Sequence, residues 1–113
     1  RGISSRAVEP LGVVLGIGKG EVVEYLDLDR STVSRRVAKG QALPNHSAES
    51  LLRLAELEVL SNDVFENEDE ATSWMHRSHP LLDNEAPLQS AKSSFGAQRV
   101  KDLLIATKHG FAA

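Results

Sequence analysis

The polar side chains between residues 30 and 39 (RSTVSRRVAK) have the types and the spacing needed to bind nucleic acid. This segment contains four cations and no acid. Arginine donates paired hydrogen bonds to guanine, and serine or threonine can bind base edges and phosphates. Helical periodicity places Val33 and Val37 on the inner face and the polar residues on the outer face. The predicted DNA-contacting residues are Arg30, Ser31, Thr32, Ser34, Arg35, Arg36 and Lys39.

The segment 30–39 is expected to form a helix, which a preceding helix and a tight turn would position. Residues 21–26 predict a short helix, and Asp29 in the turn 27–29 is placed to cap the helix that starts at Arg30. Gly40 is expected to end that helix. This order is that of a helix-turn-helix, whose second helix enters the major groove. A solvated helix with cations at its C-terminus shows the same pattern, so both interpretations stay open on spacing alone.

Two other patterns invite comparison with phosphate and metal sites. Residues 16–20 (GIGKG) predict a loop but lack the Walker spacing, because Val13 takes the place of its first glycine and Gly20 that of its serine or threonine. His76 and His79 have a spacing that can chelate a metal, although the helix dipole also favours histidine at a helix C-terminus. We therefore predict no catalytic residue, no metal site and no cofactor, and keep a small metal-dependent enzyme as a third alternative.

The composition predicts a small all-α protein. The 113 residues include 13 Lys+Arg and 16 Asp+Glu, for a net charge of −3, and only 4% are aromatic. Leucine, valine and alanine must therefore supply the core, a mixture that suits packed helices better than strands. Cysteine is absent, and no apolar stretch approaches the roughly 20 residues that span a bilayer. These features predict a cytoplasmic protein without a membrane segment.

The charge is unevenly distributed along the chain. Residues 1–60 contain 8 basic and 8 acidic residues, whereas residues 61–113 contain 5 basic and 8 acidic ones. The acidic run 62–70 follows a long apolar helix that is expected to begin at Ser47. The predicted domains are 1–65, a helix-turn-helix domain for DNA binding and dimerisation, and 66–113. The other helices expected are a short or broken one at 5–15, short ones at 69–77 and 87–94, and a final one at 96–109.

Several motifs follow one another in a definite order in the second half of the chain. They are Glu70–Met75, His79–Leu82, Ala86–Leu88, Ser94–Ala97, Val100–Leu104 and His109–Gly110. In this order they resemble the antitoxin and toxin-binding domain of the Xre–MbcA–ParS group. Thr32–Arg36 and Ser50–Leu54 are similar to the helix-turn-helix part of the same group. Two departures from the pattern are Asp83–Glu85, where the group usually has a glycine-containing turn, and Ser90, where it usually has leucine.

The resemblance implies an antitoxin of a type II toxin–antitoxin pair with no catalytic activity of its own. Its partner is implied to be a RES-domain toxin, related to ADP-ribosyltransferases, that consumes NAD or transfers from it. The C-terminal helix and tail would cover the active site of the toxin, and the helix-turn-helix would bind operator DNA and repress the operon. A homodimer within a larger toxin–antitoxin complex is also implied. The alternative is a stand-alone helix-turn-helix transcription regulator whose second half senses a ligand or forms a dimer. The implied toxin-contacting residues are Lys101, Lys108, His109, Gly110, Phe111 and Ala113.

Overall fold

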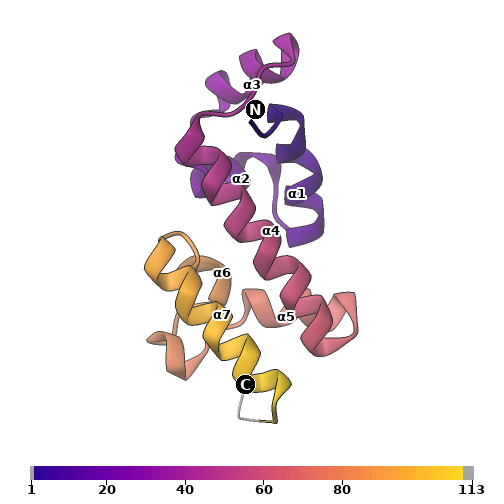
Figure 1. The fold of residues 1–113 in the computed structure, drawn as a ribbon, viewed down its shortest axis with the longest axis vertical. Helices are drawn as coiled ribbons and strands as arrows, with labels where there is room; N and C mark the ends of the chain where they lie inside the picture. The colour runs from indigo at the N-terminus through magenta and orange to yellow at the C-terminus, as the bar shows by residue number, and fades with distance from the viewer. Residues whose placement is uncertain (1, 111–113) are drawn as a thin grey trace. The chain divides into compact units, whose positions relative to one another are not determined.

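The computed structural model describes residues 2–110 of the chain, except for the side chain of Lys19. Helices supply the regular structure of this part, which contains no strand beyond the isolated bridges Ser4–Ala42 and His79–Glu85. The predicted all-α class is therefore confirmed. None of the described helices is long and apolar enough to cross a membrane. In chain order the elements are η1 (Ser5–Ala7), α1 (Val8–Leu15), α2 (Lys19–Tyr25), α3 (Arg30–Lys39), α4 (Asn45–Phe65), α5 (Glu68–His76), η2 (Pro80–Leu82), α6 (Pro87–Ser90) and α7 (Ser94–Lys108) (Figure 1).

The chain folds as two compact units, Arg1–Leu52 and Arg53–Ala113, and the division falls inside α4. The predicted functional domains, 1–65 and 66–113, divide the chain within the acidic run 62–70, and this boundary stays a prediction. The helix continues through the division because its apolar side chains recur without a break, and Leu51, Leu54 and Leu57 are all buried. The hydrophobic pattern of α4 therefore predicts how far the helix extends. It does not predict at which residue the helix stops packing in the first unit and starts packing in the second.

In the first unit, η1, α1, α2 and α3 pack around an aliphatic core. Its fully buried side chains include Val22, Leu26 and Val33. Gly16 and Gly40 follow α1 and α3 in the left-handed conformation, which glycine adopts at little cost. The predicted bounds of α3 are thereby confirmed at both ends.

The glycine-rich loop before α2 is shorter than the sequence suggested. The helix begins at Lys19, so Lys19 and Gly20 are helical and the loop is confined to residues 16–18. Gly18 is the N-cap, with an extended backbone, and the negative charge of Glu21 in the first turn interacts favourably with the helix dipole. The intrinsic cost of a glycine inside a helix is roughly 1 kcal/mol, small enough for packing to override it.

The start of α4 is bound to the end of α2. The hydroxyl of Ser47, which is fully buried, donates a hydrogen bond of 2.6 Å to the carbonyl of Leu26, the C-cap of α2. The helix itself begins at Asn45, two residues before the predicted start. Ser47 thus satisfies a backbone acceptor at a helix end, which a buried carbonyl requires.

The second unit is built by α5, α6, α7 and the end of α4. Val100, Leu103 and Leu104 of α7 are buried, as their spacing predicted. Trp74 of α5 is buried between two rings, with centroid distances of 5.6 Å to Phe65 and 6.0 Å to His79. Helix α6 ends at Ser90, earlier than predicted, and η2 was not predicted.

Gly96 allows α6 and α7 to approach each other closely. It lies in the first turn of α7, where a Cβ atom would overlap the carbonyl group of Ser90. The backbone of α7 therefore approaches the end of α6 more closely than any side chain would allow. The chain turns between the two helices, and the hydroxyl of Ser93 then caps α7 by accepting a hydrogen bond of 2.9 Å from the Gly96 N–H.

Replacement of Gly96 by alanine should destabilise the second unit. The methyl group meets backbone rather than a movable side chain, and overpacking of this kind costs about 1–3 kcal/mol. We expect a correspondingly lower urea midpoint for Gly96→Ala. The matched control is Gly18→Ala, because a Cβ atom at Gly18 has no neighbour within 4 Å. Equal midpoints for the two variants would contradict the close approach.

Candidate functional site

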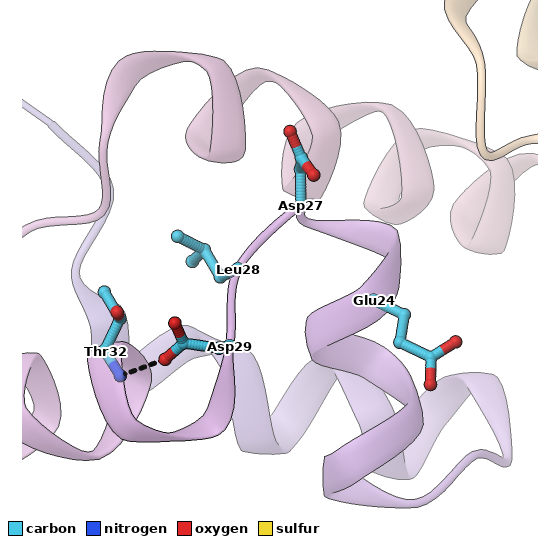
Figure 2. A pocket seen from close by; sticks show the side chains of 5 residues that line it. All are labelled: Glu24, Asp27, Leu28, Asp29 and Thr32. Atoms are coloured by element: carbon cyan, nitrogen blue, oxygen red, sulfur yellow. Dashed lines mark hydrogen bonds between the residues drawn. The ribbon is translucent and has the colours of Figure 1, made fainter.

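The turn between α2 and α3 is fixed by a side-chain cap. The carboxylate of Asp29 accepts a hydrogen bond of 2.7 Å from the Thr32 N–H, as the position of Asp29 in the sequence predicted (Figure 2). This hydrogen bond, joined by a second from the Thr32 side chain, lowers the pKa of Asp29 below its ordinary value. The cap therefore favours the ionised carboxylate and fixes the direction in which α3 leaves the turn.

The outer face of α3 carries most of the predicted DNA-contacting residues. Ser31, Ser34, Arg35 and Lys39 are exposed, and Thr32 is half-buried. Val33 is buried and anchors the helix, as predicted, whereas Val37 is only half-buried. The helix thus presents a polar face to solvent, and its exposed cations are Arg30, Arg35 and Lys39.

Two cations of α3, Arg30 and Arg36, also contact other parts of the first unit. The guanidinium of Arg30 lies over Gly20 of α2, where a Cβ atom would overlap it. Arg36 is half-buried and its Nη1 donates a hydrogen bond of 2.7 Å to the carbonyl of Ala42. Sequence reasoning missed both contacts, because the pattern of charges does not show the conformations of long side chains.

An acidic hollow adjoins the start of α3. Glu24, Asp27 and Asp29 line a cavity of about 550 Å³ together with Leu28 and Thr32, and in Figure 2 the Glu24 and Asp27 side chains point away from the Asp29 cap. The three carboxylates would repel an anionic group such as a phosphate at the start of α3. The acids are evident in the sequence, but their position beside the basic helix follows only from the fold.

The predicted toxin-contacting lysines are ion-paired with α4. Lys101 Nζ lies 2.9 Å from Glu56 Oε2, and Lys108 is paired with Asp63 in the same way. His109 and Gly110 are exposed. Phe111 and Ala113 lie outside the described residues. The structure therefore places the first four of these residues along the last two turns and the end of α7.

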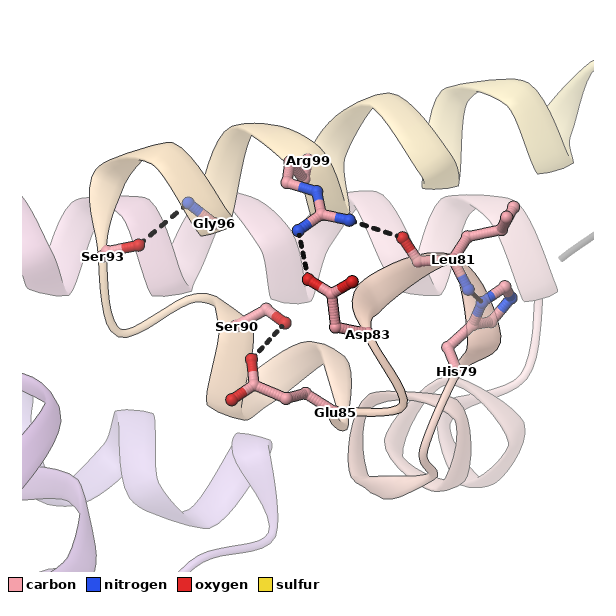
Figure 3. Close-up of polar contacts among 8 residues, drawn as sticks. All are labelled: His79, Leu81, Asp83, Glu85, Ser90, Ser93, Gly96 and Arg99. Carbon is pink, nitrogen blue, oxygen red and sulfur yellow. Dashed lines mark hydrogen bonds and ion pairs between the residues drawn. The ribbon is translucent and has the colours of Figure 1, made fainter.

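A second group of side chains holds η2 against α7 (Figure 3). Arg99 of α7 donates hydrogen bonds to the Leu81 carbonyl, at 2.7 Å, and to the Asp83 carboxylate, at 3.2 Å. Asp83 and Asn84 have positive φ angles, which is the left-handed conformation expected at this turn for Asn84. The sequence prediction did not single out Arg99, and no short motif could have identified its partners.

The neighbouring polar contacts complete this group. The hydroxyl of Ser90, which departs from the family pattern, donates to the Glu85 carboxylate at 3.1 Å. His79 is buried, and its Nδ1 accepts a hydrogen bond of 3.1 Å from the Leu81 N–H (Figure 3). That nitrogen is therefore engaged in capping η2. Among the described residues, no group of three His, Cys, Asp or Glu side chains is arranged to hold a metal ion.

Comparison with known proteins assigns the C-terminal part of the chain. Residues 61–110 match the family described as the antitoxin Xre/MbcA/ParS C-terminal toxin-binding domain. The matched range lies inside the second compact unit, and it contains the motifs of the second half of the chain that suggested the resemblance. No curated protein matches the chain.

The Asp29 cap generates a prediction about pH. A carboxylate whose pKa is lower in the folded state stabilises the fold fully above its unfolded pKa, and this stabilisation is lost as the pH falls through the folded value. Wild-type stability should therefore decrease below about pH 4 in part through Asp29. Asn also caps helices but does not titrate. We expect Asp29→Asn to lose less thermal stability than the wild type in this acid range.

Asp29→Ala serves as the matched control for the cap. It removes the acceptor as well as the charge, so its unfolding temperature should already be lower at pH 7, where Asp29→Asn should resemble the wild type. Thermal unfolding followed by circular dichroism at neutral and acid pH measures all three proteins. Parallel pH profiles for the wild type and Asp29→Asn would contradict the role of the ionised cap.

Proposed function

Because residues 61–110 belong to the antitoxin Xre/MbcA/ParS C-terminal toxin-binding domain family, we propose that this chain is the antitoxin of a type II toxin–antitoxin pair. The observation that carries the proposal is the family match itself. It falls within one compact unit that has its own buried core, so the matched residues form a folded domain of this chain.

The toxin in this proposal is a RES-domain protein that uses NAD, and the antitoxin covers its active site. The exposed end of α7 supports this assignment. Lys108, His109 and Gly110 present a basic, accessible helix end, and Phe111 follows it in the sequence. A pocket for an anionic and partly aromatic dinucleotide suits a cation and an aromatic ring. Lys108 pairs with Asp63 in an exposed ion pair, which contributes only about 0–1 kcal/mol and is exchanged easily.

The second activity in this proposal is repression of the antitoxin's own operon. The order α2, capped turn, α3 supports it, together with the exposed Arg35 and Lys39 on the outer face of α3. Operators are commonly twofold symmetric, and a homodimer would present two copies of α3 about one helical turn of DNA apart. The acidic hollow limits the DNA contact to the side of α3 that carries these two cations.

Deletion of Gly110–Ala113 tests the assignment of the C-terminal tail. The shortened chain should no longer neutralise the toxin, because the active site would stay open to NAD. Growth after toxin induction and NAD consumption by the purified complex measure this effect. The same truncated protein should bind operator DNA with unchanged affinity, which provides the internal control. Full neutralisation by the truncated chain would exclude the tail as the inhibitory segment.

Arg35 and Arg36 provide a matched pair for the DNA proposal. Arg35→Ala should weaken operator binding and reduce the slope of log K against log salt by roughly one for each phosphate that the variant no longer neutralises. It should leave stability unchanged, because Arg35 is exposed. Arg36→Ala should also lower the free energy of unfolding by about 1 kcal/mol, because its hydrogen bond to Ala42 is removed. An unchanged salt slope for Arg35→Ala would contradict the assignment of α3.

A further inference from the structure

Within the matched range 61–110, two of the most exposed apolar side chains flank one arginine. Phe95 has 74% of its surface exposed and Leu81 has 60%. Phe95 lies one turn before Arg99, so both occupy the same side of α7. Leu81 lies next to Arg99, which donates to its carbonyl at 2.7 Å. We call the surface formed by Leu81, Phe95 and Arg99 the η2–α7 surface.

This surface plays no part in the interior of the second unit. The core there is supplied by other residues of the same elements, such as Leu82 of η2 and Val100 of α7, which are both fully buried. Single exposed apolar residues are ordinary, but a phenylalanine and a leucine around one arginine have the composition found at the centre of protein interfaces. The pattern therefore indicates a contact with another protein rather than a requirement of folding.

The backbone beneath these side chains is held in place before any partner binds. Arg99 joins α7 to η2 through Leu81 and Asp83, and Asp83 and Asn84 hold the following turn in the left-handed conformation. The close approach at Gly96 and the Ser93 cap fix the first turn of α7, next to Phe95. Such preorganisation reduces the entropy cost of association. The Asp83 carboxylate also pairs with Arg99, which leaves the centre of the surface close to neutral.

The area needed for stable binding indicates which partner this surface meets. A specific protein interface covers about 800 Å² on each side, from roughly 20–30 residues. The end of α7 and the tail offer far fewer residues than that, so a toxin that they inhibit must also contact another part of the domain. At about 1.5 Å per residue, Phe95 lies about 21 Å along α7 from His109, so one toxin molecule is large enough to contact both ends of this helix.

We infer that the η2–α7 surface is the apolar anchor on which the toxin docks, separate from the tail that blocks the toxin's active site. This inference rests on the proposed function, because it takes the toxin of the pair as the partner. Binding and inhibition are then carried by different residues. Phe95 and Leu81 supply affinity, and residues 109–113 supply inhibition.

The test measures binding of the full-length chain to the purified toxin of the pair by isothermal titration calorimetry. Hot-spot side chains contribute about 2 kcal/mol or more, which corresponds to roughly 30-fold in Kd. We expect at least this reduction in affinity for Phe95→Ser and roughly tenfold for Leu81→Ser. Phe95→Leu keeps an apolar side chain and should stay within about fivefold of the wild type. Circular dichroism should show the wild-type fold for all three variants, because both side chains are exposed.

Val13→Ser is the matched control, since Val13 is also 74% exposed but lies in the first unit, outside the family match. It should bind the toxin within about twofold of the wild type. Wild-type affinity in Phe95→Ser and Leu81→Ser would overturn the inference and leave the proposed function intact. Loss of self-association in these variants at unchanged toxin affinity would also overturn it, and would assign the surface to a second copy of the chain. A wild-type chain that does not bind the toxin would overturn the proposed function, and the inference with it.

Discussion

The contact between Gly96 and the carbonyl group of Ser90 lets the start of α7 lie directly against the end of α6, and the other end of α7 carries the candidate toxin contacts Lys108 and His109. Because no side chain separates the two backbones at this point, α7 can pack tightly on α6 and bury Val100, Leu103 and Leu104. The opposite sides of the same helix are then fixed as well. One carries Phe95 and Arg99, and another carries the lysines that pair with α4. A helix begun one residue later would turn by about 100° and present other side chains.

Two arginines in this chain donate hydrogen bonds that hold backbone carbonyls of other segments in place. Arg36 donates to the Ala42 carbonyl and Arg99 to the Leu81 carbonyl, and in both cases the acceptor lies in a turn or short helix outside the arginine's own element. A guanidinium can satisfy such carbonyls because it has several donors on a long, flexible stem. This use has a consequence for function. When some arginines of a helix already donate hydrogen bonds within the protein, fewer of them can bind an anionic partner than a count of the cations suggests.

The parts of the fold that the sequence predicted well are those with a local physical cause. The bounds of α3 follow from the Asp29 cap and from Gly40, and the buried stripe of α7 follows from helical periodicity. The close approach of α6 and α7 depends instead on a contact between residues of two different elements, Ser90 and Gly96. Contacts between different elements also decide where α4 is divided and which partners Arg30, Arg36 and Arg99 have. The sequence therefore predicted which charged residues the candidate site contains, but not which of them form hydrogen bonds or packing contacts within the protein.

The uneven charge of the chain matters because electrostatic effects are local. At physiological ionic strength the Debye length is about 8 Å, so a DNA phosphate responds to nearby charges rather than to the net charge of −3. In the proposed DNA complex, a phosphate close to α3 would be attracted by Arg35 and Lys39 and repelled by the acidic hollow of Glu24, Asp27 and Asp29. The acids would thereby restrict the orientation in which the helix approaches DNA. The excess of acids in residues 61–113 disfavours DNA contact there and leaves the apolar η2–α7 surface available to a protein partner.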